Sequence, residues 1–430
     1  MDSFILKGDI AYCDENKKLV TVKDGFLICI NGLIEGIFQD VPDRFRFLPI
    51  KDCSNQLIIP GMTDLHIHAA QYAFRGTGMD VELLDWLQKY AFPEESRFQD
   101  LQYAEKAYSI FADSVKKSAT TRLCMFASRH TDATLLLMDK MEASGLISYV
   151  GKVNMDRNAP DPLREESAES SFSETERFLR EWNERKYRRT FPILTPRFTP
   201  SCTDELMDRL GELKEKYAVS VQSHLSENPS EIQFVSELCP WTNDYFEAYD
   251  QFGLLGNRNQ TEKCIMAHCI WSSEREVDKL KENGVFVAHC PSSNVNVRSG
   301  IAPVKKYLER GLKVGLGSDV AGGETESLFS TITDAIKASK VYTRFIDEKT
   351  MPLTFEEAFY LATRGGGEFF GKVGAFEQGY EADVIVLRDE LLKTTMNFTI
   401  AERLERSVYL GLDRMGITHK FVQGKEISSD

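Results

Sequence analysis

Short apolar runs alternate with longer amphipathic stretches over most of this 430-residue chain. Eight runs rich in β-branched residues have the length of buried strands: residues 57–68, 119–128, 147–155, 191–198, 219–227, 264–270, 284–291 and 313–320. The segments between them have the helical period, as in "TDELMDRLGELKEKY", whose apolar residues form one stripe: Leu206, Met207, Leu210 and Leu213. Eight strands alternating with helices predict an α/β fold, a (β/α)8 barrel of the TIM type. An open doubly wound sheet is the alternative, but its glycine-rich first turn is missing.

The two ends of the chain have a different pattern from the middle. The first 60 residues are short strands and turns, with Asp24-Gly25 and Asn31-Gly32 as hairpin signals. Strand character returns near the other end in "GYEADVIVLRDE" and "HKFVQGKEI". We therefore predict a small β-sandwich domain built from residues 1–60 and 371–430, and a metal-dependent barrel hydrolase domain over residues 61–370.

Composition and charge narrow the class of protein. Lys plus Arg total 52 against 66 Asp plus Glu, a net charge of −14, which argues against nucleic acid or an anionic membrane as partner. No uncharged run approaches the roughly 20 residues of a membrane span, and no secretion signal follows the first methionine. The nine cysteines have no paired spacing. They indicate a reducing compartment, and we expect a cytoplasmic protein.

Histidines and one aspartate end four of the eight predicted strands. Among only 7 histidines, His66 and His68 stand one residue apart, on the same face of the first strand. His224, His268 and Asp319 end the fifth, sixth and eighth runs. By itself His268 fits a core histidine and Asp319 a helix cap, but active sites of such barrels lie at the carboxyl ends of the strands. Together they predict a site for Zn²⁺, with iron as the alternative because imidazole binds both.

Five segments, in this order, resemble the amidohydrolase superfamily, and its deaminase branch most: "PGMTDLHIHAAQY", "SHLSE", "MAHC", "HCPSSN" and "GLGSD". The resemblance implies a hydrolase acting on C–N bonds of cyclic amidines, whose metal ligands are His66, His68, His224 and Asp319. His268 either completes this set or contacts the substrate. Two-metal relatives carry a carboxylated lysine on a middle strand, for which Lys152 is the candidate. Glu227, three residues beyond His224, marks the single-metal members instead, so one Zn²⁺ per chain is expected.

Hydrolytic deamination needs hydroxide at the ring carbon, a proton on a ring nitrogen and a proton on the departing ammonia. A bound metal makes hydroxide available by lowering the pKa of its water to about 7. The predicted catalytic residues are Glu227 as the proton shuttle to the ring, Asp319 as the base beside the metal, and His268, which polarises the substrate. Glu227 also fits the simpler role of a carboxylate at a helix N-terminus.

Two segments resemble the family members that act on guanine: "HIHAAQYAFRGTGMDVELLDWLQKYAFPEESRF" and "LTPRFTPSCTDELM". This similarity implies conversion of guanine to xanthine and ammonia. It also implies polar contacts from Gln71 and Arg197, with Phe198 against the ring. A salt bridge for Arg197 and core packing for Phe198 are the alternatives. Other bases open to such an enzyme are adenine, cytosine, an S-adenosylhomocysteine-type nucleoside and a triazine.

Several other residues near these motifs have open or secondary roles. We expect Trp86 and Phe92 to pack over the pocket, on a cover that the nearby glycines make flexible. Asn294, after the seventh run, is expected to orient His289 or the substrate. His130 matches the family pattern without a defined role. A homodimer is expected because it is common in similar enzymes.

Overall fold

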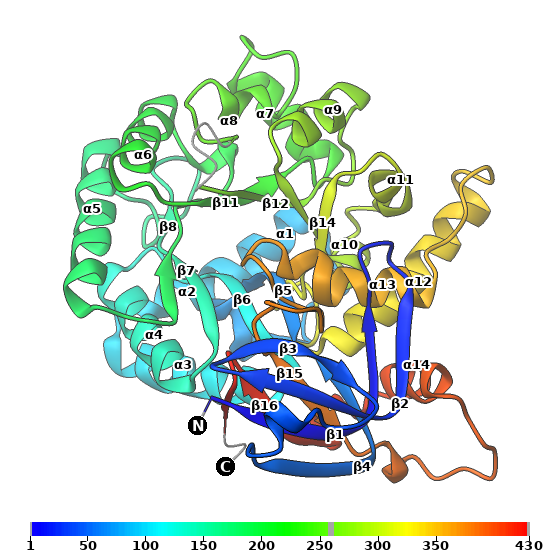
Figure 1. Ribbon diagram of the computed structural model, residues 1–430. Helices are drawn as coiled ribbons and strands as arrows, with labels where there is room; N and C mark the ends of the chain where they lie inside the picture. Colours follow the sequence, from blue (N-terminus) through cyan, green and yellow to red (C-terminus); the bar gives the residue numbers. More distant parts are fainter. Residues whose placement is uncertain (1, 257–261, 428–430) are drawn as a thin grey trace.

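The structure is a computed structural model that describes residues 2–256 and 262–427. Its centre is a ring of short parallel strands surrounded by helices (Figure 1). The strands of the ring are β5 (Met62–His68), β6 (Thr120–Phe126), β7 (Ile147–Gly151), β8 (Val153–Asn154), β9 (Thr190–Pro192), β10 (Thr195–Pro196), β11 (Val221–Leu225), β12 (Cys264–His268), β13 (Phe286–His289) and β14 (Lys313–Leu316).

Parallel pairing and backbone bonds close this ring. Hydrogen bonds join β5-β6-β7-β9 and β11-β12-β13-β14, while β8 pairs with β10. Leu194 bridges the two halves by pairing with Val221. At the other junction the N–H of Asp319 donates to the carbonyl of His66 at 2.8 Å, and the N–H of His68 donates to the carbonyl of Val320 at 2.9 Å. The predicted barrel is confirmed, and its third and fourth runs are each divided into two short strands.

Helices cover the outside of the ring and connect its strands. The longer ones are α3 (Leu101–Lys117), α4 (Thr131–Ser144), α5 (Ala168–Arg185), α6 (Asp204–Tyr217), α7 (Pro229–Leu238), α9 (Glu274–Glu282), α12 (Leu328–Phe345) and α14 (Ile400–Tyr409). The shorter ones are α1 (Leu83–Trp86), α2 (Phe92–Ser96), α8 (Glu247–Asp250), α10 (Pro291–Asn296), α11 (Val304–Glu309) and α13 (Phe355–Tyr360). The predicted stripe of α6 is buried, from Leu206 to Leu213.

The two ends of the chain meet in one sheet below the barrel in Figure 1. Its strands, in spatial order, are β17 (Lys425–Glu426), β16 (Ile417–Val422), β15 (Val384–Leu387), β4 (Ile50–Pro60), β1 (Phe4–Cys13), β2 (Leu19–Ile30) and β3 (Leu33–Phe38). All seven are hydrogen-bonded in a single sheet, rather than in the two separate sheets that the term β-sandwich implies. The run 57–68 is divided, because residues up to Pro60 belong to this sheet and β5 begins at Met62.

One of the two predicted hairpin turns is wrong. Asn31-Gly32 does join β2 to β3, but Asp24-Gly25 lies inside β2. There the register against β1 shifts, and Asp24 has φ of 48° while its N–H donates to Oδ1 of Asp9 at 3.0 Å. The Asp-Gly pair therefore forms a bulge, which uses the same left-handed backbone as a tight turn.

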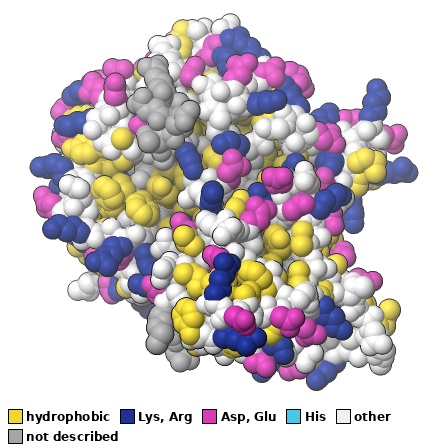
Figure 2. All heavy atoms as spheres, viewed as in Figure 1, with side chains coloured by type: hydrophobic (Ala, Val, Ile, Leu, Met, Phe, Trp, Pro, Cys, Tyr) yellow, Lys and Arg dark blue, Asp and Glu magenta, His cyan; other side chains and the backbone are white. Residues whose placement is uncertain are grey.

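Buried ionic contacts tie the sheet to the barrel. The guanidinium of Arg122, on β6, contacts Asp383 at 2.7 Å and Glu381 at 2.6 Å. On β16, Lys420 donates to backbone carbonyls beside the end of α3, including that of Ser118 at 2.9 Å. On the face drawn in Figure 2, basic and acidic side chains are interspersed without a large basic area. Over the described ranges, no helix combines the length and apolarity that a membrane crossing requires.

Candidate metal centre and active site

The first barrel strand brings its histidines to the carboxyl end of the ring. Every residue of β5 is buried, and alternation places His66 and His68 on one face. Asp64, two residues earlier, accepts hydrogen bonds from the N–H of His66 at 3.1 Å, from the N–H of Ser318 at 3.0 Å and from the Oγ of Ser318 at 2.5 Å. Burial raises the pKa of Asp64 to about 7. This carboxyl group links the end of β5 to the segment that carries Asp319.

Three imidazoles converge at this point. Ligand atoms of His66, His68 and His224 all lie within 4.8 Å of one another, and those of His66, His268, Cys290 and Asp319 form a second group by the same measure. The Oδ1 of Asp319 lies 3.1 Å from the Nε2 of His66 and 3.4 Å from that of His68. Cys290 is not among the residues predicted for the site. Its thiol sits against the same cluster because it follows β13 directly.

The donor set fits a divalent metal ion. His224 donates from Nδ1 to the carbonyl of Arg197 at 2.6 Å, which leaves the Nε2 lone pair directed at His68, 3.3 Å away. The Nδ1 of His66 has no hydrogen-bond partner within the described residues, and its Nε2 faces the carboxylate of Asp319. Burial lowers the pKa of His66, His68 and His224, which favours the neutral imidazoles that bind metal. Three imidazole nitrogens with one carboxylate oxygen are a set typical of zinc.

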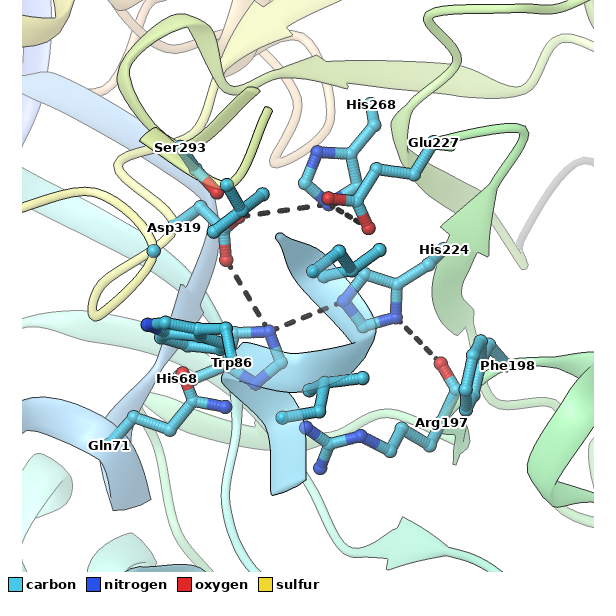
Figure 3. Close-up of a pocket in the computed structure, with 14 residues that line it drawn as sticks. His68, Gln71, Trp86, Arg197, Phe198, His224, Glu227, His268, Ser293 and Asp319 are labelled. Atoms are coloured by element: carbon cyan, nitrogen blue, oxygen red, sulfur yellow. Dashed lines mark hydrogen bonds and ion pairs between the residues drawn. The ribbon is translucent and has the colours of Figure 1, made fainter. Parts of the chain in front are cut away.

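Glu227 and His268 face each other beside this cluster (Figure 3). The Nε2 of His268 lies 3.5 Å from Oε2 of Glu227 and 3.7 Å from Oδ2 of Asp319. Burial raises the pKa of Glu227 to about 7, although His268 opposes the rise. Helix α7 has Asn228 as its N-cap, so Glu227 stands outside the helix and its side chain lines the pocket. Ser299 donates to its Oε1 at 3.1 Å.

The predicted substrate contacts line the same pocket. His68 ends β5 and Gln71 lies in η2 (Ala69–Phe74), which follows β5, while Arg197 and Phe198 follow β10. Figure 3 shows the amide of Gln71 and the guanidinium of Arg197 turned toward each other across the pocket. Every predicted site residue lines this cavity except His66, which is fully buried.

An apolar wall closes the pocket on one side. It comes mainly from the helical segment formed by α1 and η3 (Leu87–Ala91), and its lining residues are Leu83, Trp86 and Leu87. The indole Nε1 of Trp86 is buried without a hydrogen-bond partner in the described residues. Phe92 is not in the lining, and its ring packs 5.1 Å from the guanidinium of Arg197 instead.

The structure gives partners to Asn294 and Lys152 and places His130 outside the pocket. Asn294 Oδ1 lies 2.8 Å from Nδ1 of His268, so Asn294 orients His268 rather than His289. Lys152 is buried in an ion pair with Glu165, at 2.5 Å, and does not line the pocket. His130 precedes α4 as its N-terminal flanking residue, and its ring does not line the pocket.

Comparison with known proteins agrees with these motifs. The model of the Amidohydrolase family matches residues 57–427. Guanine deaminase of Homo sapiens is 38% identical over 396 residues, which cover 89% of this chain and 86% of that protein. Guanine deaminase of Escherichia coli (strain K12) is 33% identical over 419 residues, with 94% and 91% covered.

A solved structure is similar over the whole chain. The crystal structure of guanine deaminase from C. acetobutylicum, with guanine bound in its active site, superimposes with a TM-score of 0.95. It is 46% identical and the match covers 99% of this chain and 100% of that one.

Proposed function

This chain belongs to the amidohydrolase family, and we propose that it deaminates guanine hydrolytically to xanthine and ammonia. The supporting observation is that one buried pocket combines the histidine cluster, Glu227 and the two polar side chains Gln71 and Arg197. The 46% identity to a guanine deaminase with bound guanine supports the same substrate.

We propose a single Zn²⁺ per chain, held by His66, His68, His224 and Asp319, with Fe²⁺ as the substitute that the same ligands accept. Such an ion supplies hydroxide from water near neutral pH. The ion pair between Lys152 and Glu165 supports a one-metal site, because it engages the amine that a bridging carboxylated lysine would need.

In this proposal two carboxylates move the protons. Water attacks C2 of guanine while Asp319 accepts the proton that the water loses. Glu227, whose raised pKa suits proton exchange near neutral pH, delivers a proton to the adjacent ring nitrogen. Asp319 then transfers its proton to the amino group, the C2–N bond breaks, and ammonia leaves. As the new C2 hydroxyl becomes a carbonyl, its proton returns to Glu227, so the reaction consumes one water per guanine and both carboxyl groups regain their starting protonation states.

His268 is proposed to polarise the substrate and to hold Glu227 and Asp319 in register. Its Nδ1 is engaged by Asn294, so its Nε2 faces the two carboxylates. Burial alone would lower the pKa of His268, but the charges of Glu227 and Asp319 outweigh it and raise this pKa. With Nδ1 engaged by Asn294, only the protonated imidazole, which the raised pKa favours, carries a donor at Nε2.

Gln71, Arg197 and Phe198 are proposed to select guanine. Guanine presents a carbonyl beside ring N–H groups, which an arginine donor and a glutamine amide recognise together. A base without the carbonyl leaves the buried guanidinium of Arg197 short of an acceptor. Steady-state assays on guanine, adenine, cytosine, a triazine and S-adenosylhomocysteine test the proposal. Rapid turnover of another base with negligible turnover of guanine would overturn it.

We further propose a cytoplasmic homodimer. All nine cysteines are free and buried, which supports a reducing compartment. The end of α12 exposes Phe345 by 80% and the next residue, Ile346, by 59%, as an interface between two copies requires. Light scattering should give twice the chain mass, and a monomeric mass would reject the dimer.

A further inference from the structure

The polar side of the pocket is supported by a carboxylate that does not line it. Glu95 lies in α2, directly after the segment that forms the apolar wall, and is 1% exposed. Glu95 lies inside the segment that resembles the guanine-acting family members, but "FPEES" has no metal-ligand or catalytic spacing that would assign it a role. A buried carboxylate requires strong partners, so the question is what Glu95 binds.

Glu95 bridges the two proposed guanine contacts. Its Oε1 accepts from the Nε2 of Gln71 at 2.8 Å, and its Oε2 accepts from the Nη1 of Arg197 at 2.6 Å. Glu95 lies in α2, Gln71 in η2 and Arg197 just after β10, so three separate segments meet at this carboxylate. One carboxylate therefore fixes the positions of both side chains relative to each other.

The bond to Glu95 also determines which way the amide of Gln71 faces. A carboxylate only accepts hydrogen bonds, so the NH₂ group must point to Glu95. On the other side the Oε1 of Gln71 accepts from the N–H of Ala321 at 3.2 Å, two residues after Asp319. A flipped amide would place acceptor against acceptor and donor against donor. One N–H and one oxygen lone pair of Gln71 remain for a ligand.

Arg197 depends on Glu95 for charge and for orientation. Its side chain is 3% exposed, and Glu95 is its salt-bridge partner within the described residues. The ring of Phe92, three residues before Glu95 and thus on the same face of α2, lies 5.1 Å from the guanidinium. The carboxylate neutralises the buried cation and takes one N–H, which directs the rest of the planar group to the pocket.

We propose that Glu95 is a positioning residue for substrate specificity: it orients Gln71 and Arg197 so that together they recognise the 6-oxo and N1–H edge of a 2-aminopurine substrate. This rests on the proposed function and adds a residue that does not touch the base. Its effect is on recognition of that edge, whereas Glu227 and Asp319 carry the proton transfers.

The test substitutes Glu95→Gln, which keeps the size and removes the charge. We expect the KM for guanine to rise about 10-fold or more, with a smaller change in kcat, because a charge-assisted pair is weakened. Competitive inhibition by two unreactive bases locates the effect. The inhibition constant of hypoxanthine, which has the 6-oxo and N1–H edge, should rise about as much, while that of purine, which lacks it, should change less than about twofold.

A double variant separates positioning from a merely structural role. Arg197→Met leaves Glu95 buried without its cation, so adding E95Q to R197M should cost no further kcat/KM and should raise it slightly. Losses that multiply would overturn the inference. The inference would also be overturned if the inhibition constants of hypoxanthine and purine rose equally in E95Q. It would be overturned as well if the wild-type enzyme bound both bases with the same affinity.

Separate controls test whether the variants fold and whether guanine is the substrate. Glu165→Gln, in the buried ion pair with Lys152 outside the pocket lining, is the matched control and should leave the ratio of the two inhibition constants unchanged. If E95Q does not fold, Glu95→Asp, which keeps the charge but shortens the reach, carries the same measurements. If the wild-type enzyme does not turn over guanine, the proposed function and this inference are both overturned. Guanine turnover without the predicted ratio overturns the inference alone.

Discussion

Replacing Glu227 by glutamine removes one titratable proton from the pocket and leaves a side chain of nearly the same shape. In the wild type Oε1 accepts from Ser299 at 3.1 Å, and glutamine keeps that acceptor. The other oxygen becomes an NH₂ group facing Nε2 of His268, 3.5 Å away. Because Asn294 engages the Nδ1 of His268, that Nε2 can accept once the imidazole is neutral. The substitution therefore leaves no buried polar atom without a partner.

The expected loss is confined to chemistry. General acid–base groups contribute about 10²- to 10⁴-fold to rate, which is about 3 to 5 kcal/mol of activation free energy. We expect kcat on guanine to fall by about 10²-fold or more, with KM, metal content and melting temperature close to wild type. Guanine consumption and ammonia release give kcat, and elemental analysis gives the metal content.

A second buried carboxylate provides a control that distinguishes loss of the proton shuttle from loss of any buried charge. Glu276 is buried, accepts from Ser226 and from the N–H of Phe246, and lies outside the pocket lining. Glu276→Gln should change stability but leave kcat within a fewfold of wild type. A Glu227→Gln enzyme that retains its metal and turns over guanine within tenfold of wild type would remove Glu227 from the mechanism.

Four further expectations concern metal, stability and pH. Chelation should abolish guanine turnover and zinc should restore it, and turnover that survives complete metal removal would contradict the proposed site. Lys152→Met should keep one metal equivalent per chain by elemental analysis, whereas two equivalents in wild type that fall in the variant would indicate a bridged pair. Arg122→Met should lower the free energy of unfolding, measured in denaturant, by about 3 to 5 kcal/mol, because it leaves Asp383 buried without its cation. A decrease of less than about 1 kcal/mol would show that this ion pair is dispensable for stability. Burial lowers the pKa of His130 to about 4, so as pH falls the unfolded chain binds this proton before the folded chain does. The stability that His130 contributes is therefore full above about pH 6.5 and is lost as pH falls toward 4. His130→Gln should flatten the pH dependence of the unfolding free energy in this range, and an unchanged slope would exclude His130 as its source.

Much of the architecture could be predicted because it depends on local pattern. Eight apolar runs separated by amphipathic helices specify a closed parallel barrel, and the carboxyl end of each run shows which side chains reach one rim. His66 and His68 share a face because of the two-residue period of a strand. Asp24-Gly25 shows the limit of such local signals, because the same left-handed backbone serves a bulge as well as a turn.

The partners of buried polar groups could not be predicted, because they depend on contacts between distant segments. Nothing near Asn294 in sequence indicates that it engages His268 rather than His289. The ion pair that occupies Lys152 likewise follows from the position of Glu165 after the third strand. Hydrogen bonding of this kind is decided by which backbones pack together, not by the spacing of residues along one of them.

The sequence by itself determined the residue types at the strand ends, and therefore the kind of chemistry this protein can perform. Only the tertiary structure decided which of those residues meet. Backbone bonds between β5 and the segment that follows β14 bring His66 next to Asp319, and the packing of α2 against the rim places Glu95 between Gln71 and Arg197. The physical reason is that a buried charge is stable only with its partner in place. That partner comes from a distant segment when the ring closes, and not from residues next to the charge in the chain.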